Sequence, residues 1–259
     1  MRDSTFSALF GALSNELRMS TIANNLANVN TTSYKKDKIA FHDTFQRFAH
    51  DYLGDAKPFL RDKDMWPKPN VMARPRLSDQ QIDFSQGSLK QTGNQLDFAI
   101  SGEGFFKIQV GDEQLLTRAG NFVVSAEGTL MTPEGHPVLG GGSPIDLPPT
   151  ATIQADGGGA LRVGDDQVAQ LDVVTVTDLT QLEKVGKNAY RIKEGGAAEE
   201  IEAEDAVVEQ GYLEKGNVEV VTEMVAMIET QRAFEAYTKV IRGDSELDTK
   251  LLTQVGRQS

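Results

Sequence analysis

The chain contains no cysteine among its 259 residues, so neither disulfide bonds nor thiolate chemistry is available to it. Aromatic residues make up only 7% of the sequence and include one tryptophan, which is poor material for stacking against sugars. No apolar run reaches the roughly eighteen residues of a membrane-spanning helix, so we expect no membrane insertion. The N-terminus also lacks the basic start, apolar centre and cleavage site of a secretory signal.

Basic side chains are scarce relative to acidic ones after residue 80. The net charge is −12, but residues 1–80 carry 12 basic against 9 acidic side chains and the remainder carries 14 against 29. An acidic body repels phosphate backbones, so we expect no nucleic-acid partner. A solvated acidic surface is the simplest interpretation of the excess.

The C-terminal stretch from Asn217 to about Leu252 has the apolar spacing of a long helix. Steps of three and four residues place side chains on one stripe, and a sustained average of 3.5 is typical of coiled coils. We expect Asn217 to cap this helix and Gly243 to interrupt it. Its apolar residues form two seams: Val220, Met224, Met227, Phe234 and Ile241, and Ala233, Tyr237, Val240, Leu247 and Leu251. Two apolar seams on one helix predict that it packs against two neighbouring elements.

The N-terminal residues repeat this pattern, and the helix they predict should end near Asn28, where turn-forming residues begin. One seam contains Phe6, Phe10, Leu13, Leu17 and Ala27, and the other Met19, Ile22, Leu26 and Val29. The two terminal helices are natural partners, with their remaining faces left for other subunits. A helix pair confined to the core of a monomer is an equally open interpretation.

The middle of the chain divides into two parts. Phe41, Phe45 and Phe48 sit at helical spacing, and the proline-containing stretch 54–75 suggests an extended connector. From Leu96 to about Tyr212, apolar residues alternate with polar ones between glycine-containing turns, which predicts antiparallel strands.

The predicted fold class is therefore α+β, with paired, coiled-coil-like terminal helices and an inserted, mainly antiparallel all-β domain. The predicted division is a discontinuous helical domain (1–33 plus 217–259), a connector region with extended and partly helical segments (34–90), and a β-rich domain (91–216).

No motif indicates catalysis. The three histidines, His42, His50 and His136, occur without a cysteine or HExxH frame, so we expect no metal site. No G-x-S-x-G motif is present, and the glycine clusters lead into strands, which marks them as turns and not phosphate loops. We expect no catalytic residue, no cofactor and no enzymatic activity.

Three blocks of the sequence resemble the bacterial flagellar rod and hook axial proteins. They are IANNLANVNTTSYKKDKIAF (22–41), QTGNQLDFAISGEGFFKI (91–108) continued by residues 115–140, and GYLEKGNVEVVTEMVAMIETQRAFEAYTKVI (211–241). The resemblance covers about half the chain, in the family's order. One departure is Ser33, where the family usually has glycine; if that position needs a positive φ, serine is strained there.

The resemblance implies a structural subunit of the flagellar basal-body rod, in which terminal helices pack into a helical tube and the β domain forms the outer layer. It implies a periplasm-spanning location, torque transmission, and export by the flagellar type III apparatus without a cleaved signal. The implied partners are other copies of the chain, neighbouring rod proteins and that apparatus. Segments 83–94 and 244–257 are similar to a proximal-rod member, with a distal-rod subunit as the alternative. A glycan-binding β module is the rival from another class.

The helical patterns suggest which residues form the assembly interface. We expect Asn25, Asn28 and Asn30 to cap or cross-link turns, and Gln231 and Arg232 to set register where they interrupt the apolar seam. The apolar candidates are Leu13, Leu17, Ile22, Leu26, Met224, Met227, Ile228, Phe234 and Ile241. Disordered ends in the free subunit, folding on assembly, are a further prediction.

Overall fold

A computed structural model describes residues 2–46, 72–148, 152–203 and 205–255. The chain divides into two compact units. The helical unit comprises Met1–Asn24, Lys38–Gln81 and Val221–Ser259, and the β unit comprises Asn25–Asp37 and Ile82–Val220. The expected combination of terminal helices with a mainly antiparallel β domain between them is confirmed. The three-part division with a separate connector stays a prediction.

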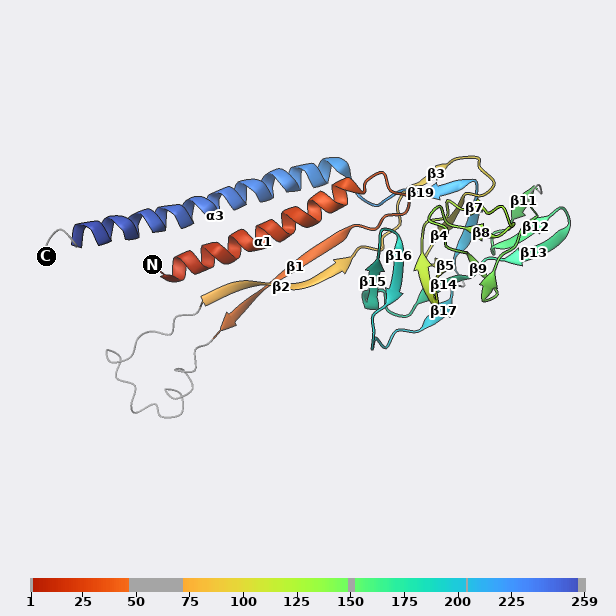
Figure 1. Ribbon diagram of the computed structural model, residues 1–259, viewed down its shortest axis with the longest axis horizontal. Helices are drawn as coiled ribbons and strands as arrows, with labels where there is room; N and C mark the ends of the chain where they lie inside the picture. Colours follow the sequence, from red (N-terminus) through yellow and green to blue (C-terminus); the bar gives the residue numbers. More distant parts are fainter. Residues whose placement is uncertain (1, 47–71, 149–151, 204, 256–259) are drawn as a thin grey trace, which may run out of the picture. The chain divides into compact units, whose positions relative to one another are not determined.

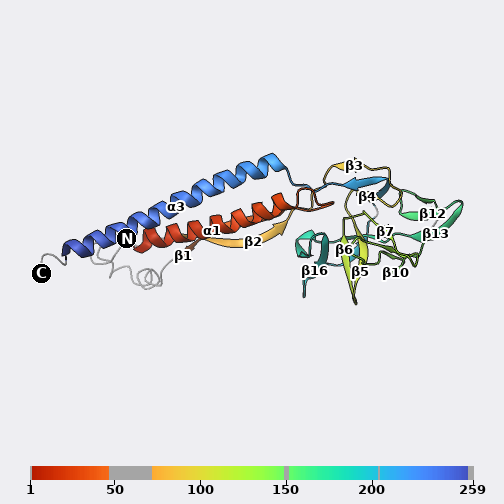
Figure 2. The ribbon, with the colours of Figure 1, turned by 45° about the horizontal axis from the view of Figure 1, so that its top comes forward.

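The helical unit is built on α1 (Arg2–Ala27) and α3 (Val220–Val255), which lie side by side and antiparallel in both ribbon views (Figures 1 and 2). Thr5 Oγ1 donates a hydrogen bond to Asp244 Oδ2 at 2.8 Å, and Gly11 lies against the ring of Tyr237. The start of α1 therefore lies beside the C-terminal half of α3. Strands β1 (Asp37–Gln46) and β2 (Met72–Ile82) form a two-stranded sheet.

Several local expectations for these segments are wrong. Phe41 and Phe45 lie in strand β1 and not in a helix; Phe48 and residues 54–71 fall outside the described residues. Gly243 does not interrupt α3, because the i to i−4 hydrogen bonding of a long helix tolerates one glycine at a modest cost. Asn217 does not cap α3, which begins three residues later, because its side chain binds other segments instead.

The β unit contains one larger antiparallel sheet and several small ones. The six-stranded sheet has the order β15-β16-β6-β5-β14-β17. Its strands are β5 (Phe105–Val110), β6 (Glu113–Thr117), β14 (Val173–Val176), β15 (Leu182–Val185), β16 (Ala189–Ile192) and β17 (Glu200–Glu202). The short 3-10 helix η2 (Leu179–Gln181) precedes β15.

The β unit also contains smaller sheets. A three-stranded sheet contains β11 (Ile153–Ala155), β12 (Ala160–Val163) and β13 (Asp166–Gln170). Four strand pairs complete the unit: β3 (Leu89–Gln91) with β19 (Tyr212–Glu214), β4 (Phe98–Ser101) with β18 (Val207–Gln210), β7 (Val123–Val124) with β8 (Leu130–Met131), and β9 (Leu139–Gly140) with β10 (Ser143–Pro144).

The core of the β unit lies on both faces of the six-stranded sheet. Successive side chains of a strand point to opposite faces. Accordingly, Phe106 packs into a cluster with Phe98 and Leu130, whereas the adjacent Phe105 packs with Leu116 and Tyr190. The aromatic pair Phe105–Tyr190 meets edge to face, with ring centroids 5.9 Å apart. The six-stranded sheet is therefore covered by apolar side chains on both faces.

Candidate assembly surface

The surface of α1 has a continuous apolar stripe. Phe6, Leu9, Leu13 and Leu17 follow one another at steps of three or four residues and are 40% to 54% exposed. The opposite side of the helix is buried and consists mainly of small residues, including Ala8 and Ala12. This helix exposes large apolar side chains to solvent while it buries alanines, so its apolar stripe is available for packing against another surface.

The surface of α3 has an apolar segment near the start of the helix. Val221 is 70% exposed, and Met224, Val225 and Ile228 are about half exposed. Farther along the helix, Val240 and Leu247 are also about half exposed. The opposite side of the helix is the more buried one: Thr230 is fully buried, and Met227, Phe234 and Ile241 are half-buried at helical spacing around it.

The predicted interface residues therefore separate into two groups. Leu13, Leu17, Met224, Ile228, Gln231 and Arg232 are exposed, whereas Ile22 is buried and Leu26, Met227, Phe234 and Ile241 are half-buried. The apolar exposed members lie on the two surfaces just described. The predicted interface did not include Phe6, Leu9, Val221 and Val225, although helical spacing alone places them beside the residues that it did include.

The asparagines at the end of α1 differ in environment. Asn25 is buried, and its side chain makes two hydrogen bonds of 3.0 Å with the main chain of Asp37, donating to the carbonyl and accepting from the N–H. Asn28 Oδ1 accepts a hydrogen bond from Thr31 Oγ1 at 3.3 Å, and Asn30 is exposed. Asn25 thus holds the end of α1 to the start of β1.

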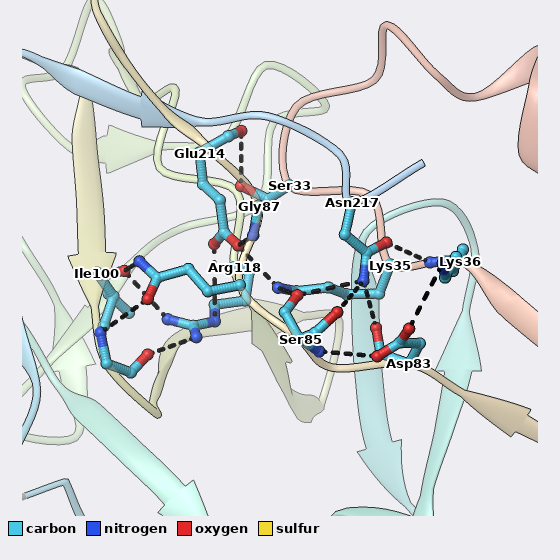
Figure 3. A network of polar contacts seen from close by, with 12 residues as sticks. Ser33, Lys35, Lys36, Asp83, Ser85, Gly87, Ile100, Arg118, Glu214 and Asn217 are labelled. Atoms are coloured by element: carbon cyan, nitrogen blue, oxygen red, sulfur yellow. Dashed lines mark hydrogen bonds and ion pairs between the residues drawn. The ribbon is translucent and has the colours of Figure 1, made fainter. Parts of the chain in front are cut away.

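A second feature, which we call the polar collar, lies within the β unit (Figure 3). It consists of side chains and main-chain groups from three segments, residues 33–37, 83–87 and 214–217, together with Arg118. Its centre is an ion pair between Lys35 Nζ and Glu214 Oε1 at 2.7 Å, with both side chains almost fully buried. These charges were not predicted, because burial of a lysine or glutamate has no signature in a single sequence.

Every charge of the pair has further partners. Lys35 Nζ donates to the carbonyl of Ser85 at 2.8 Å, and the N–H of Gly87 donates to Glu214 Oε1 at 2.8 Å. The guanidinium of Arg118 lies 3.8 Å from Glu214 Oε2 and donates to the carbonyl of Gly102 at 2.6 Å. Burial lowers the pKa of Lys35, and the neighbouring Glu214 carboxylate opposes this shift.

Asn217 joins all three segments of the polar collar. Its Oδ1 accepts from the N–H of Lys36 at 2.8 Å, and its Nδ2 donates to the carbonyl of Asp83 at 2.7 Å. The N–H of Asp83 in turn donates to the carbonyl of Lys36 at 2.9 Å. The collar thereby holds together the chain following α1, the chain following β2 and the chain preceding α3.

Lys184 of β15 extends the collar to the six-stranded sheet. Its Nζ pairs with Asp37 Oδ1 at 2.9 Å, donates to the carbonyl of Lys35 at 3.0 Å, and lies 4.3 Å from the centroid of the Tyr34 ring. The segment following α1 is therefore held to the six-stranded sheet of the β unit.

Within the described ranges, no three histidine, aspartate or glutamate side chains are grouped so that they could hold a metal ion. None of the helices described is both long and apolar enough to cross a membrane. A surface pocket of the β unit is lined by residues that include Glu113, Leu116, Arg191 and Glu200. Arg191 pairs with Glu113, and Lys107 pairs with Glu200.

Three family models match the chain. Residues 9–35 match the flagella basal body rod protein model, residues 99–162 match the D1 domain of the flagellar hook protein FlgE/F/G, and residues 209–254 match the C-terminal region of the flagellar basal body rod FlgEFG proteins.

Curated relatives match nearly the whole chain. The flagellar basal-body rod protein FlgF of Caulobacter vibrioides is 34% identical, over 96% of this chain and 98% of its own length. The flagellar basal-body rod protein FlgG of Bacillus subtilis is 31% identical, over 97% and 98%. FlgF of Mesorhizobium japonicum is 30% identical over the full length of both chains.

Proposed function

Because this chain belongs to the flagellar basal-body rod protein family, we propose that it is a structural rod subunit that assembles through the exposed apolar faces of α1 and α3. The observation that carries the assembly surface is the exposure of four large apolar side chains in one stripe of α1 and five near the start of α3. Such contiguous apolar surfaces mark interaction sites. Each large apolar side chain that a neighbour fully buries contributes roughly 1.5–3 kcal/mol.

The place of the subunit is the basal body, in the proximal segment of the rod, where it transmits torque across the periplasm. Its partners are other copies of the chain and neighbouring rod proteins, and it reaches the rod through the flagellar type III export apparatus. The function is structural and not enzymatic. The polar collar supports the mechanical role, since hydrogen bonds join the segments that connect with α1, β2 and α3 to one another. The Lys184–Asp37 ion pair holds the first of these segments to the six-stranded sheet.

Substitution of an exposed stripe residue tests the assembly surface. We expect Leu13→Asp to abolish swimming in cells that lack the native copy, because a charge in the stripe must be desolvated on assembly. The thermal unfolding of the purified variant should match that of the parent, since Leu13 is 51% exposed. Ser7→Asp, on an exposed position of the same helix away from the stripe, is the matched control. Normal swimming of the Leu13→Asp variant contradicts the proposed surface.

The alternative position is the distal rod, because relatives named FlgF and FlgG match over similar lengths. Purified hook–basal bodies distinguish the two positions. A few copies at the inner part of the rod are expected for a proximal subunit, whereas several-fold more copies extending outward identify a distal one. Absence from purified basal bodies contradicts the rod assignment and returns attention to a glycan-binding role for the β unit.

A further inference from the structure

The apolar seams of α1 and α3 do not by themselves fix the level at which the two helices pack. The apolar residues on the more buried side of each helix recur every seven residues: Met227, Phe234 and Ile241 on α3, and Ala12, Met19 and Leu26 on α1. Moving α3 by seven residues, about 10 Å at 1.5 Å of rise per residue, brings each apolar residue of α3 to the place of the next one. The seams alone therefore permit more than one register.

Direct contacts between the helices oppose such a movement only weakly. Gly11 lies against the ring of Tyr237, and Thr5 Oγ1 donates a partly buried hydrogen bond to Asp244 Oδ2. A movement of α3 by seven residues toward its own C-terminus brings the smaller Thr230 to Gly11, so the close approach at Gly11 does not prevent it. The hydrogen bond of Thr5 is a weak restraint, because water replaces it when it is lost. The register therefore needs a further determinant.

The observed register places the end of α1 beside the start of α3. Antiparallel helices gain the same rise per residue, so the contact of Gly11 with Tyr237 makes Ala27, the last residue of α1, level with Val221. Helix α3 begins at Val220, one residue earlier. Both helices therefore join the rest of the chain at one level, through the segments that form the polar collar.

A short tether connects the polar collar with α3. Asn217 donates its N–H to the carbonyl of Tyr34 at 3.1 Å and accepts from the N–H of Lys36 through Oδ1 at 2.8 Å (Figure 3). Only two residues lie between Asn217 and Val220, and the earlier of them, Val218, is buried. The three steps from Asn217 to Val220 span at most about 11 Å when fully extended, so little slack remains for a further 10 Å. Such a movement therefore requires release of Asn217 or unwinding of the first turns of α3.

The end of α1 is fixed to the same collar. The side chain of Asn25, in the last turn of α1, is buried and makes two hydrogen bonds of 3.0 Å with the main chain of Asp37. The N–H of Ser33 donates to the carbonyl of Glu214 at 2.9 Å, and both residues are buried. Together with the bonds of Asn217, these bonds join the end of α1 to the segment that precedes α3. Breaking them would leave buried polar groups unsatisfied, which makes them a strong restraint.

We infer that the polar collar sets the register of the α1–α3 pair, with Asn25 and Asn217 as the positioning residues at the two helix ends. The seams determine which faces of the helices meet, and the collar determines at which level they meet. A polar contact that selects one register among several apolar ones has the same role in coiled coils. The inference concerns one subunit by itself, so it holds or fails independently of the rod function and of any neighbouring copy.

A distance measurement between two spin labels on the purified chain tests the register. Nitroxides at Glu16→Cys and Glu246→Cys occupy exposed positions, and the absence of native cysteine restricts labelling to them. Glu16 is level with Arg232, so the labels are about 21 Å apart along the pair. A movement of α3 by seven residues toward its C-terminus lengthens this separation by about 10 Å, which pulsed electron–electron double resonance resolves.

Two changes release α3 from the collar in different ways. Asn217→Ala removes the side-chain bonds, and insertion of three glycines between Val218 and Glu219 lengthens the tether by about 10 Å while every collar side chain stays. We expect a single distance in the parent and, in both changed chains, an additional population about 10 Å longer. Leu161→Ala is the control, because Leu161 is fully buried in the core of the β unit, outside the segments of the collar. It should lower the unfolding temperature and keep the parent distance.

An unchanged distance in the released chains, or a broad distribution without the longer population, overturns the inference and assigns the register to the helices themselves. A parent without a defined distance also overturns it, since the collar then does not align the helices. Loss of the parent distance in Leu161→Ala overturns a specific role of the collar, because general destabilisation then moves α3. Where Asn217→Ala unfolds the β unit by circular dichroism, or differs from the glycine insertion, the insertion decides between support and rejection.

Discussion

Lys35 and Glu214 form an ion pair whose side chains are almost entirely removed from water. Such a pair contributes little net stability relative to well-packed apolar residues, because each charge loses its hydration. Loss of one partner is a different matter: without Glu214 the buried Lys35 loses its carboxylate, and without Lys35 the buried Glu214 keeps only Arg118, at 3.8 Å from its Oε2. The pair is therefore best understood as fixing one geometry of the polar collar.

Double-mutant analysis separates these two effects. We expect Glu214→Gln to lower the free energy of unfolding by roughly 3–5 kcal/mol, because it leaves the buried Lys35 without its partner. We expect Lys35→Met to lower it by less, because the Arg118 guanidinium still faces Glu214. The double variant should lose clearly less than the combined loss of the single variants. Denaturant unfolding of the four proteins measures the coupling. Additive losses would contradict a direct interaction between the two charges.

Ser33 is the one non-glycine residue with a positive φ, 56°, in the described part of the chain. The family's usual glycine at this position suggested that serine would be strained here. The positive φ places Ser33 in the left-handed region, where a Cβ atom is disfavoured. Its N–H donates to the carbonyl of Glu214 at 2.9 Å, which holds the backbone in this conformation beside the polar collar.

Glycine and alanine at this position isolate the strain, because both lack the serine hydroxyl. We expect Ser33→Gly to be more stable than Ser33→Ala by roughly 1 kcal/mol, since only glycine adopts a positive φ without a Cβ penalty. Thermal and denaturant unfolding provide the comparison. Equal stability of the two variants would indicate that the backbone relaxes out of the left-handed region.

At the scale of elements, the packing of α1 against α3 depends on small residues. A Cβ atom at Gly11 would approach the ring of Tyr237 to 2.6 Å, whereas one at Gly243 would meet nothing within 4 Å. Both glycines lie inside helices, so they share the same intrinsic helix penalty and differ only in surroundings.

Alanine at these two glycines should therefore have opposite effects. Gly243→Ala should stabilise α3 by about 0.5–1 kcal/mol through its higher helix propensity. Gly11→Ala should gain nothing or lose stability, because its methyl group forces Tyr237 or the whole helix to move. Helical circular dichroism followed through thermal unfolding measures both. Equal stabilisation by the two substitutions would show that Gly11 does not set the approach of the helices.

For the whole molecule, the division into two units predicts that damage to one leaves the other folded. Phe234 is half-buried on the side of α3 that carries the buried Thr230. Phe234→Asp should therefore open the helix pair and abolish assembly, while strands of the β unit keep their protection. Hydrogen exchange resolved by segment measures this, with exposed Glu235→Asp as control. Loss of protection throughout residues 98–210 would contradict independent units.

Sequence patterns alone determined the fold class, the two terminal helices and the antiparallel β body, because local periodicity reports which secondary structure buries one face. They also carried the family resemblance, which marked Ser33 as a position that would be strained if its φ were positive. They could not distinguish the seam that faces the partner helix from the one left exposed, since Leu13 and Ile22, or Met224 and Phe234, recur at the same helical spacing.

Only the tertiary structure decided which of these residues are available to another subunit, and it placed Phe41 and Phe45 in a strand. It alone revealed the polar collar, in which Lys35, Glu214 and Asn217 meet across some 180 residues of sequence. A local pattern specifies a face but not what covers it. Contacts between distant segments depend on the packing of the whole unit, and that information is absent from any single stretch of the chain.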